Sequence, residues 1–134
     1  MSPHLALMTA LLSLALTSAC KEDKVSGQID LPSGREVTLI DVITTAKGPA
    51  GATARFRFLA PGLTRADAET SVADMQALCD SYALPRTEGT VPEPQQIVIS
   101  LSSDVVPFGK AAPDVVQFFE AYSKEGGECL WQPF

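Results

Sequence analysis

An uncharged run of twelve residues, Leu5 to Leu16, separates the start of the chain from the part that can fold into a domain. Its length matches the hydrophobic region of a secretory signal peptide, whereas a helix that spans a bilayer needs about 20 residues. Small residues follow at positions 17–19, as signal cleavage requires. We therefore interpret residues 1–19 as a signal peptide. The alternative is a buried core helix, for which the run lacks an opposite polar face.

The residues around the expected cleavage site, Leu16-Thr17-Ser18-Ala19-Cys20, resemble the lipobox of bacterial lipoproteins. The resemblance implies that Cys20 is acylated and anchors the protein to a membrane, since each buried CH₂ contributes about 0.8 kcal/mol. Lys21 in the next position favours the outer membrane, with the protein facing the periplasm. The polar residues 20–28 would then form a tether. Ordinary cleavage that releases a soluble periplasmic protein is the alternative.

Cleavage after residue 19 leaves 134 − 19 = 115 residues and removes no charged side chain, so the net charge stays at −6. A surface of that sign repels phosphate backbones, which argues against nucleic acid as a partner. The removed segment contains His4, the only histidine. A mature chain without histidine lacks Ser-His-Asp, Cys-His and histidine-based zinc sites. It also has no CxxC pair and no Gly-rich phosphate loop, so we expect no metal and no cofactor.

Two cysteines remain if Cys20 carries lipid. Cys79 and Cys129 are then an even pair in an oxidising compartment, which predicts a disulfide. The bridge would close a loop of about fifty residues and stabilise the domain by roughly 4 kcal/mol. Two buried free thiols are the alternative. A catalytic thiol is disfavoured because no histidine is present to activate it.

Three segments have the composition or the alternation of β-strands, at about 36–45, 53–60 and 95–102. In the second, Phe56 and Phe58 would face the core, and Arg55 and Arg57 would face outward.

A helix is expected over about 66–83, with Thr64 as its cap, Asp67 in a capping-box position and Pro85 as its end. Its buried stripe has helical spacing and consists of Ala68, Val72, Met75, Cys79 and Tyr82.

Residues 113–125 fit either a helix or the first strand of a hairpin, Gln117 to Lys124, that turns at Gly126-Gly127 into Glu128 to Gln132. Aromatic density and the Gly-Gly pair favour the hairpin. The expected fold of residues 29–134 is therefore a single α+β domain. It has an antiparallel sheet of about five strands, with the helix at about 66–83 pinned to one face by the disulfide.

From Arg55 onward the chain resembles a family of short exported proteins from alphaproteobacteria, a domain of unknown function. The segments that carry the resemblance are Arg55-Phe56-Arg57-Phe58-Leu59-Ala60-Pro61, Ala73-Asp74-Met75-Gln76-Ala77-Leu78-Cys79, Ala83-Leu84-Pro85-Arg86, Gln96-Ile97-Val98-Ile99-Ser100-Leu101, Val106-Pro107-Phe108-Gly109, Phe118-Phe119-Glu120-Ala121-Tyr122 and Gly127-Glu128-Cys129-Leu130-Trp131. The resemblance implies one domain and two paired cysteines, and it implies no activity.

Acidic side chains are candidates for a cation site or for general acid and base catalysis. They are Asp67, Glu69 and Asp74 near the start of the expected helix and Asp104 in the loop after the third strand. The alternative for the first three is a solvated helix face, where acidic residues complement the helix dipole.

Two other groups of residues are candidates for binding. Arg55, Arg57 and Arg86 form a candidate anion patch, with ordinary surface ion pairs as the alternative. Val105, Val106 and Phe108 form a candidate partner contact if they are exposed, and the alternative is that they are tucked under their loop. Trp131 is expected to belong to the core.

These observations predict a non-enzymatic envelope protein, lipid-anchored or periplasmic, that binds an unknown envelope protein or component. The alternative is a small periplasmic enzyme that uses carboxylates as acid and base, which requires two carboxyl groups converging in a cleft.

Overall fold

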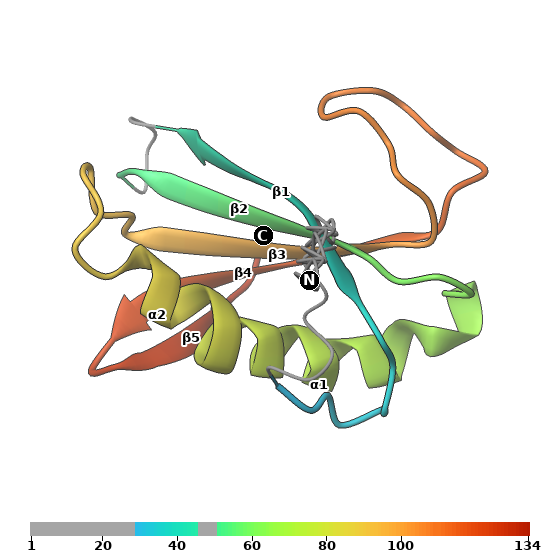
Figure 1. Cartoon of the computed structure of the whole chain (residues 1–134), viewed down its shortest axis with the longest axis horizontal. Coiled ribbons are helices and arrows are strands. Elements are labelled where there is room, and N and C mark those ends of the chain that lie inside the picture. The colour runs from blue at the N-terminus through green and yellow to red at the C-terminus, as the bar shows by residue number, and fades with distance from the viewer. Residues whose placement is uncertain (1–28, 46–50) are drawn as a thin grey trace, which may run out of the picture.

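The computed structural model describes residues 29–45 and 51–134, and the expected signal peptide, the tether and Cys20 lie outside these residues. Five strands form one sheet in the order β1-β2-β3-β4-β5. Figure 1 shows the helices along one side of this sheet and the loop between β3 and β4 extending from the other. The strands are β1 (Thr38–Thr45), β2 (Thr53–Leu59), β3 (Gln96–Ser102), β4 (Gln117–Glu125) and β5 (Glu128–Gln132).

The sheet is mixed, so the prediction of an antiparallel sheet was wrong for one pair of strands. β2 and β3 run parallel, whereas the β1–β2, β3–β4 and β4–β5 pairs are antiparallel. The helical segment that connects β2 to β3 is the reason. A helix packed on the face of a sheet carries the chain back to the starting edge, and the next strand then runs in the same direction. The α+β architecture and the number of strands agree with the prediction.

The helical segment is longer and more broken than the expected helix at about 66–83. It consists of a 3₁₀ turn at Arg65–Asp67, α1 (Ala68–Leu78), a π turn at Cys79–Ala83 and α2 (Leu84–Thr87). Pro85 does not end it. Pro85 falls in the first turn of α2. A missing N–H costs little at that position.

The core lies between the helices and one face of the sheet. Phe56 and Phe58 of β2 point into it and are at most 2% exposed, as the alternation in the sequence predicts. Tyr82 packs edge-on against both rings, with centroid distances of 6.4 and 5.5 Å. Other fully buried side chains on this face are Met75, Leu78, Ile97, Ile99, Leu101 and Tyr122.

The buried side of α1 differs from the expected stripe. Ala68 is exposed and Val72 is 47% exposed, whereas Ser71 and Asp74 are buried beside Met75. Asp74 is buried because the chain before β1 crosses the helix there. The backbone N–H of Ser33 donates to its Oδ1 at 3.0 Å, and the Ser33 hydroxyl donates to its Oδ2 at 2.5 Å. A buried carboxylate with such partners joins two segments of the fold.

The predicted disulfide between Cys79 and Cys129 is confirmed, and it ties the π turn to β5. Hydrogen bonds reinforce this connection between the helical segment and β5. The backbone N–H of Cys129 donates to Asp80 Oδ1 at 2.9 Å, and Gln76 Nε2 donates to the Cys129 carbonyl at 2.9 Å. Disulfides of this kind are typical of oxidising compartments outside the cytoplasm.

The carboxy-terminal segment is the hairpin that the aromatic residues and the Gly-Gly pair predict. Gly126 and Gly127 separate β4 from β5, and their φ angles are +58° and +79°. Two consecutive positive φ angles are what a tight two-residue hairpin turn requires, and glycine adopts them without steric cost. Within residues 29–45 and 51–134, no helix is long and apolar enough to span a bilayer.

Candidate functional site

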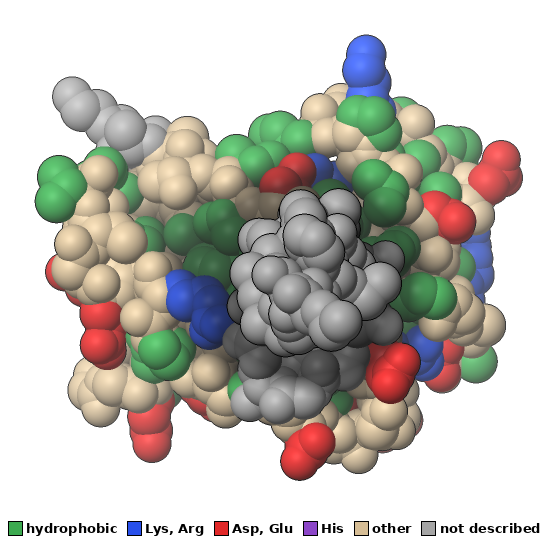
Figure 2. Space-filling model, viewed as in Figure 1, with side chains coloured by type: hydrophobic (Ala, Val, Ile, Leu, Met, Phe, Trp, Pro, Cys, Tyr) green, Lys and Arg blue, Asp and Glu red, His purple; other side chains and the backbone are tan. Residues whose placement is uncertain are grey.

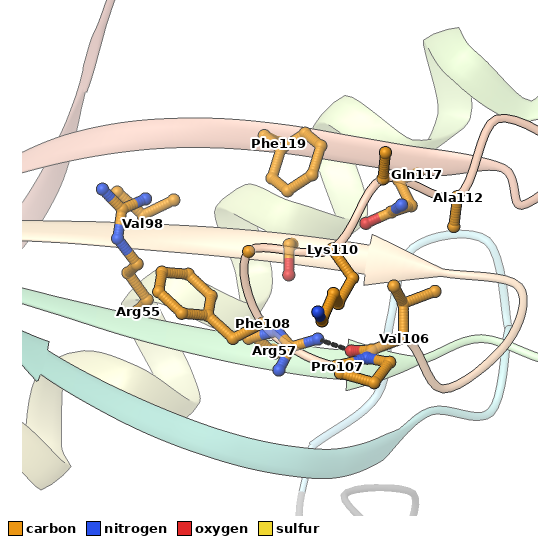
Figure 3. A pocket seen from close by; sticks show the side chains of 13 residues that line it. Arg55, Arg57, Val98, Val106, Pro107, Phe108, Lys110, Ala112, Gln117 and Phe119 are labelled. Carbon is orange, nitrogen blue, oxygen red and sulfur yellow. Dashed lines mark hydrogen bonds between the residues drawn. The ribbon is translucent and has the colours of Figure 1, made fainter.

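The face of the sheet opposite the helices carries a cavity of about 320 Å³, which is small for a ligand site. Its floor comes from β2, β3 and β4, and its wall is the loop between β3 and β4 (Figure 3). We call this space the loop pocket. It is lined by Arg55, Arg57, Val98, Ser100, Val106, Pro107, Phe108, Gly109, Lys110, Ala111, Ala112, Gln117 and Phe119.

The loop that forms the wall is fixed at its base and at its tip. At the base, the backbone N–H of Ser103 donates to the Val116 carbonyl at 2.9 Å. At the tip, Lys110 donates its backbone N–H to the Pro107 carbonyl at 3.1 Å and closes a turn. Gly109 has a φ of +77° in this turn, a value that favours glycine at the third position of a type II turn. The turn therefore presents Phe108 at its tip.

Arg57 holds the tip against the sheet. Its Nη1 lies 2.8 Å from Asp41 Oδ2 on β1, and its Nη2 donates to the carbonyl oxygen of Val106 in the loop. Its guanidinium also lies 5.8 Å from the centroid of the Phe108 ring, within the range of a cation–π contact. One side chain of β2 thus joins the edge strand β1 to the loop.

Arg55 and Lys110 are the other two cations of the loop pocket. Neither side chain has a hydrogen-bond or ion-pair partner among the residues that the structure describes. No acidic residue lines the pocket, although the chain as a whole has a net charge of −6. The pocket is therefore a local positive site on an acidic protein, where an anion is favoured.

Aromatic and aliphatic side chains complete the loop pocket. Phe108 is 57% exposed and Phe119 on β4 is 50% exposed, while Val98 and Val106 are buried. In Figure 3 the Phe108 ring lies beside the two arginines of β2, and the Phe119 ring lies on β4, with β3 between them. Pockets of small-molecule sites combine apolar walls with a few polar groups in this way.

The fold combines parts of two sites that the sequence suggested separately. Arg55 and Arg57 of the candidate anion patch lie under Val106 and Phe108 of the candidate partner contact. Val106 is 7% exposed and tucked in, whereas Val105 is 62% exposed and does not line the pocket.

Arg86 does not join the other two arginines. Its guanidinium lies 3.6 Å from the centroid of the Tyr82 ring and donates to the Tyr82 carbonyl at 2.9 Å. Tyr82 packs on Phe56 and Phe58, so the sheet separates Arg86 from the loop pocket.

Sequence reasoning missed Lys110 and Phe119 as members of this site. The alternation along β4 contains a signal for Phe119, because Phe118 and Phe119 are adjacent and must point to opposite faces. Phe118 packs against the core, and Phe119 lies opposite Ser100 on the outer face. Trp131, which was expected in the core, is 55% exposed, so that prediction was wrong. Its indole N–H, on β5, donates to Glu120 Oε2 on the adjacent strand β4 at 2.5 Å.

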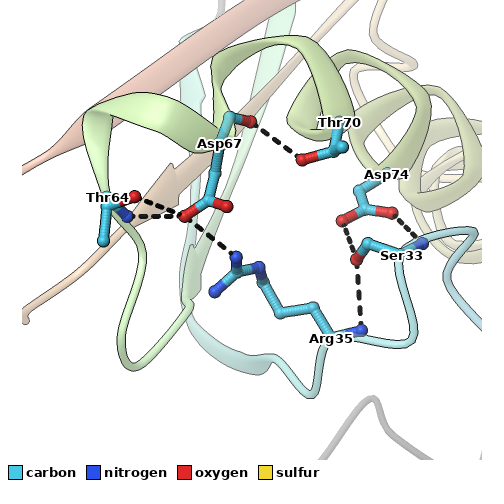
Figure 4. A network of polar contacts seen from close by, with 6 residues as sticks. All are labelled: Ser33, Arg35, Thr64, Asp67, Thr70 and Asp74. Carbon is cyan, nitrogen blue, oxygen red and sulfur yellow. Dashed lines mark hydrogen bonds and ion pairs between the residues drawn. The ribbon is translucent and has the colours of Figure 1, made fainter.

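The candidate carboxylates near α1 have structural partners. Asp67 Oδ2 accepts from the backbone N–H of Thr64 at 2.8 Å and from the Thr64 hydroxyl at 2.9 Å, and it lies 3.2 Å from Arg35 (Figure 4). The hydrogen bonds from Thr64, together with Arg35, hold the pKa of Asp67 below its ordinary value. The expected capping position of Asp67 is confirmed.

The four candidate carboxylates do not form one site. Asp74 is bound to Ser33, Glu69 is exposed on α1, and Asp104 accepts a hydrogen bond from Ser103 in the loop. None of them lines the loop pocket. Figure 2 likewise shows acidic side chains spread around the visible face of the molecule. In the part of the chain that the structure describes, no group of acidic residues and cysteines has the geometry to hold a metal ion.

Comparison with known proteins places the chain in a family. Residues 10–134 match a family of unknown function, DUF6497. The chain belongs to this family. The match extends further toward the amino terminus than the segments from Arg55 onward that suggested a family of unknown function. No curated protein matches the chain, and no solved structure matches it.

Proposed function

We propose that this DUF6497 protein is a non-enzymatic binding protein of the bacterial cell envelope and that it holds a small anionic ligand in the loop pocket. The observation that carries the proposal is the composition of the pocket. Arg55, Lys110 and two exposed aromatic rings line it together with Arg57, which is paired with Asp41, and no acidic residue is part of the lining on a chain with a net charge of −6. This combination attracts a negative charge and also offers apolar surface to the rest of the ligand.

The proposed location is the periplasmic side of a membrane, with lipid on Cys20 as the anchor. The lipobox-like sequence at residues 16–20 and the disulfide between Cys79 and Cys129 support it. With residues 20–28 as a tether, the domain would meet ligands in the periplasm. Mass spectrometry of the native protein tests this part. An acylated amino terminus at Cys20 is expected, and an unmodified terminus there or elsewhere contradicts the anchor.

Titration with anilinonaphthalene sulfonate, an aromatic anion that fluoresces when bound in apolar surroundings, tests the binding function. We expect a rise in fluorescence that saturates at one dye per chain and that weakens when Phe119 is replaced in Phe119→Ala. Leu130→Ala is the matched control, because Leu130 is also a partly exposed apolar residue of the hairpin but lies outside the pocket. No saturable binding, or equal loss in both variants, contradicts the proposed function.

A further inference from the structure

We infer that the ligand of the loop pocket is a hydrophobic carboxylate, that Arg55 binds its carboxylate, and that Arg57 is a positioning residue that holds the loop without touching the ligand. This inference rests on the proposed function and adds the chemical class of the ligand and the separate roles of the two arginines.

Arg57 is already occupied. Its two terminal nitrogens contact Asp41 and the Val106 carbonyl, and its side chain is only 12% exposed. A ligand that took these donors would leave the Asp41 carboxylate and a loop carbonyl without their partner, which makes Arg57 a poor anion site. Its contacts instead set the position of Phe108, and therefore the shape of the wall.

Arg55 has the properties that Arg57 lacks. It lies two residues earlier on the same face of β2, opposite Val98 on β3. Its guanidinium has no partner among the described residues, and in Figure 3 it lies over Val98 at one end of the pocket. A free planar guanidinium on an apolar floor matches the two oxygens of a carboxylate with two parallel hydrogen bonds.

The surroundings favour a planar single charge over a phosphate group. Phosphate sites usually employ a helix N-terminus or a series of backbone N–H groups. Both helices lie on the other face of the sheet, and the neutral polar side chains of the pocket are Ser100 and Gln117. Lys110, an exposed residue of the loop, adds one ammonium group to the lining. One guanidinium fork with one ammonium is a suitable set for a carboxylate.

The apolar part of the ligand would lie between Phe108 and Phe119. Both rings are about half exposed and line the same space as Val106 and Val98. A volume of about 320 Å³ is at the lower limit of small-molecule sites, so the apolar part of the ligand is a medium alkyl chain or a small group of aromatic rings. Long lipids and folded proteins do not fit inside it.

Calorimetric titration of the processed chain, residues 20–134, with decanoate, decanol and decyltrimethylammonium tests the inference. This chain lacks the apolar signal segment and carries Cys20→Ser, which prevents acylation and avoids detergent. We expect decanoate to bind and decanol, the neutral analogue, to bind at least roughly tenfold more weakly. Arg55→Gln should lower the affinity for decanoate by roughly 10- to 100-fold and leave the affinity for decanol unchanged. Arg65→Gln, which changes an exposed arginine outside the pocket, should change neither.

Arg57→Gln separates a positioning role from a binding role when it is made together with Asp41→Asn, so that no unpaired carboxylate remains beside the pocket. We expect this double variant to weaken the binding of decanoate and of decanol by the same factor and to speed amide hydrogen exchange in residues 104–116, because the loop loses its attachment to the sheet. A loss confined to decanoate would show that Arg57 binds the carboxylate and would overturn the assignment.

Other outcomes also decide the question. Three outcomes would overturn the inference: equal affinity for decanoate and decanol, stronger binding of decyltrimethylammonium, or an unchanged affinity for decanoate in Arg55→Gln. The proposed function would remain intact in each case if the sulfonate dye still binds. Absence of dye binding overturns both. Thermal unfolding of each variant identifies a loss of affinity that comes from misfolding.

Discussion

Loss of the Cys79–Cys129 disulfide is expected to lower the free energy of unfolding by about 4 kcal/mol. The bridge spans 50 residues, and the chain-entropy relation gives roughly 14 cal/mol/K for a loop of that size, or about 4 kcal/mol at 25 °C. The hydrogen bonds of Gln76 and Asp80 to the backbone of Cys129 do not involve sulfur. They should survive the change, so the loss measures the cross-link together with the packing of its two buried sulfur atoms.

Urea unfolding of the Cys79→Ala/Cys129→Ala variant, followed by circular dichroism, measures this loss. With an m-value of about 2 kcal/mol/M, the midpoint should fall by about 2 M. Alanine is preferred to serine because a hydroxyl at these buried positions would lack partners. The chain with Cys20→Ser, which leaves the disulfide intact, is the control and should unfold like the unmodified chain. A difference of less than about 1 kcal/mol between variant and control would refute the reasoning.

Three further predictions concern single side chains. Asp74→Ala should lower the free energy of unfolding by about 2–4 kcal/mol, because the Ser33 donors lose a buried acceptor. Glu69→Ala, on the exposed side of the same helix, should change it by no more than about 0.5 kcal/mol, and chemical unfolding measures both. Asp67 has a lowered pKa in the folded state, so its contribution to stability is complete above its ordinary pKa of 3.8 and is lost as the pH falls through the lower folded value. Thermal unfolding measured against pH should show this decline in stability, and Asp67→Asn should lack it. Burial raises the pKa of Tyr122 above its ordinary value of 10.0, so stability should fall as the pH rises past that value, and absorbance should record its ionisation only on unfolding. Tyr122→Phe, which removes a buried hydroxyl that has no partner in the described structure, should abolish this alkaline decline without lowering stability at neutral pH.

Local patterns in the sequence predicted most of the strands, and the even number of cysteines left after Cys20 predicted the disulfide. The alternation of Arg55 to Phe58 assigned each side chain of β2 to the correct face, and the Gly126-Gly127 pair predicted the last hairpin. These features depend on neighbouring residues alone. The direction of β3 relative to β2 depends instead on how the helical segment crosses the sheet. That crossing should have been expected, because a helix between two strands favours a parallel pair.

The errors on α1 have a tertiary origin. Hydrophobic periodicity placed Val72 on the buried stripe and Asp74 outside it, and the structure has the reverse. Asp74 is buried because residues before β1 pass over the helix and supply Ser33 as a donor. A contact between residues that are 41 positions apart leaves no trace in a helical pattern.

The candidate site was predicted in fragments. Arg55 and Arg57 were identified separately from the apolar loop residues, because the two groups are more than forty positions apart in the sequence. The β2–β3–β4 register, together with the loop between β3 and β4 that folds over β2, brings them into one pocket. Arg86 was grouped with them because of its charge, but α2 lies on the opposite face of the sheet. Residue type therefore indicated the chemistry, and the fold decided which residues can share a ligand.

The central claim is that the loop pocket binds an anion with an apolar body. Amide chemical-shift changes in the isotope-labelled chain during titration with decanoate test it most directly, because every residue with a backbone N–H gives its own signal. We expect saturable changes concentrated at Arg55, Val98 and Phe119 and along residues 106–112, with the disulfide region unaffected. Changes centred on the helix side, around Tyr82 and residues 87–94, or no saturable change at all, would contradict it.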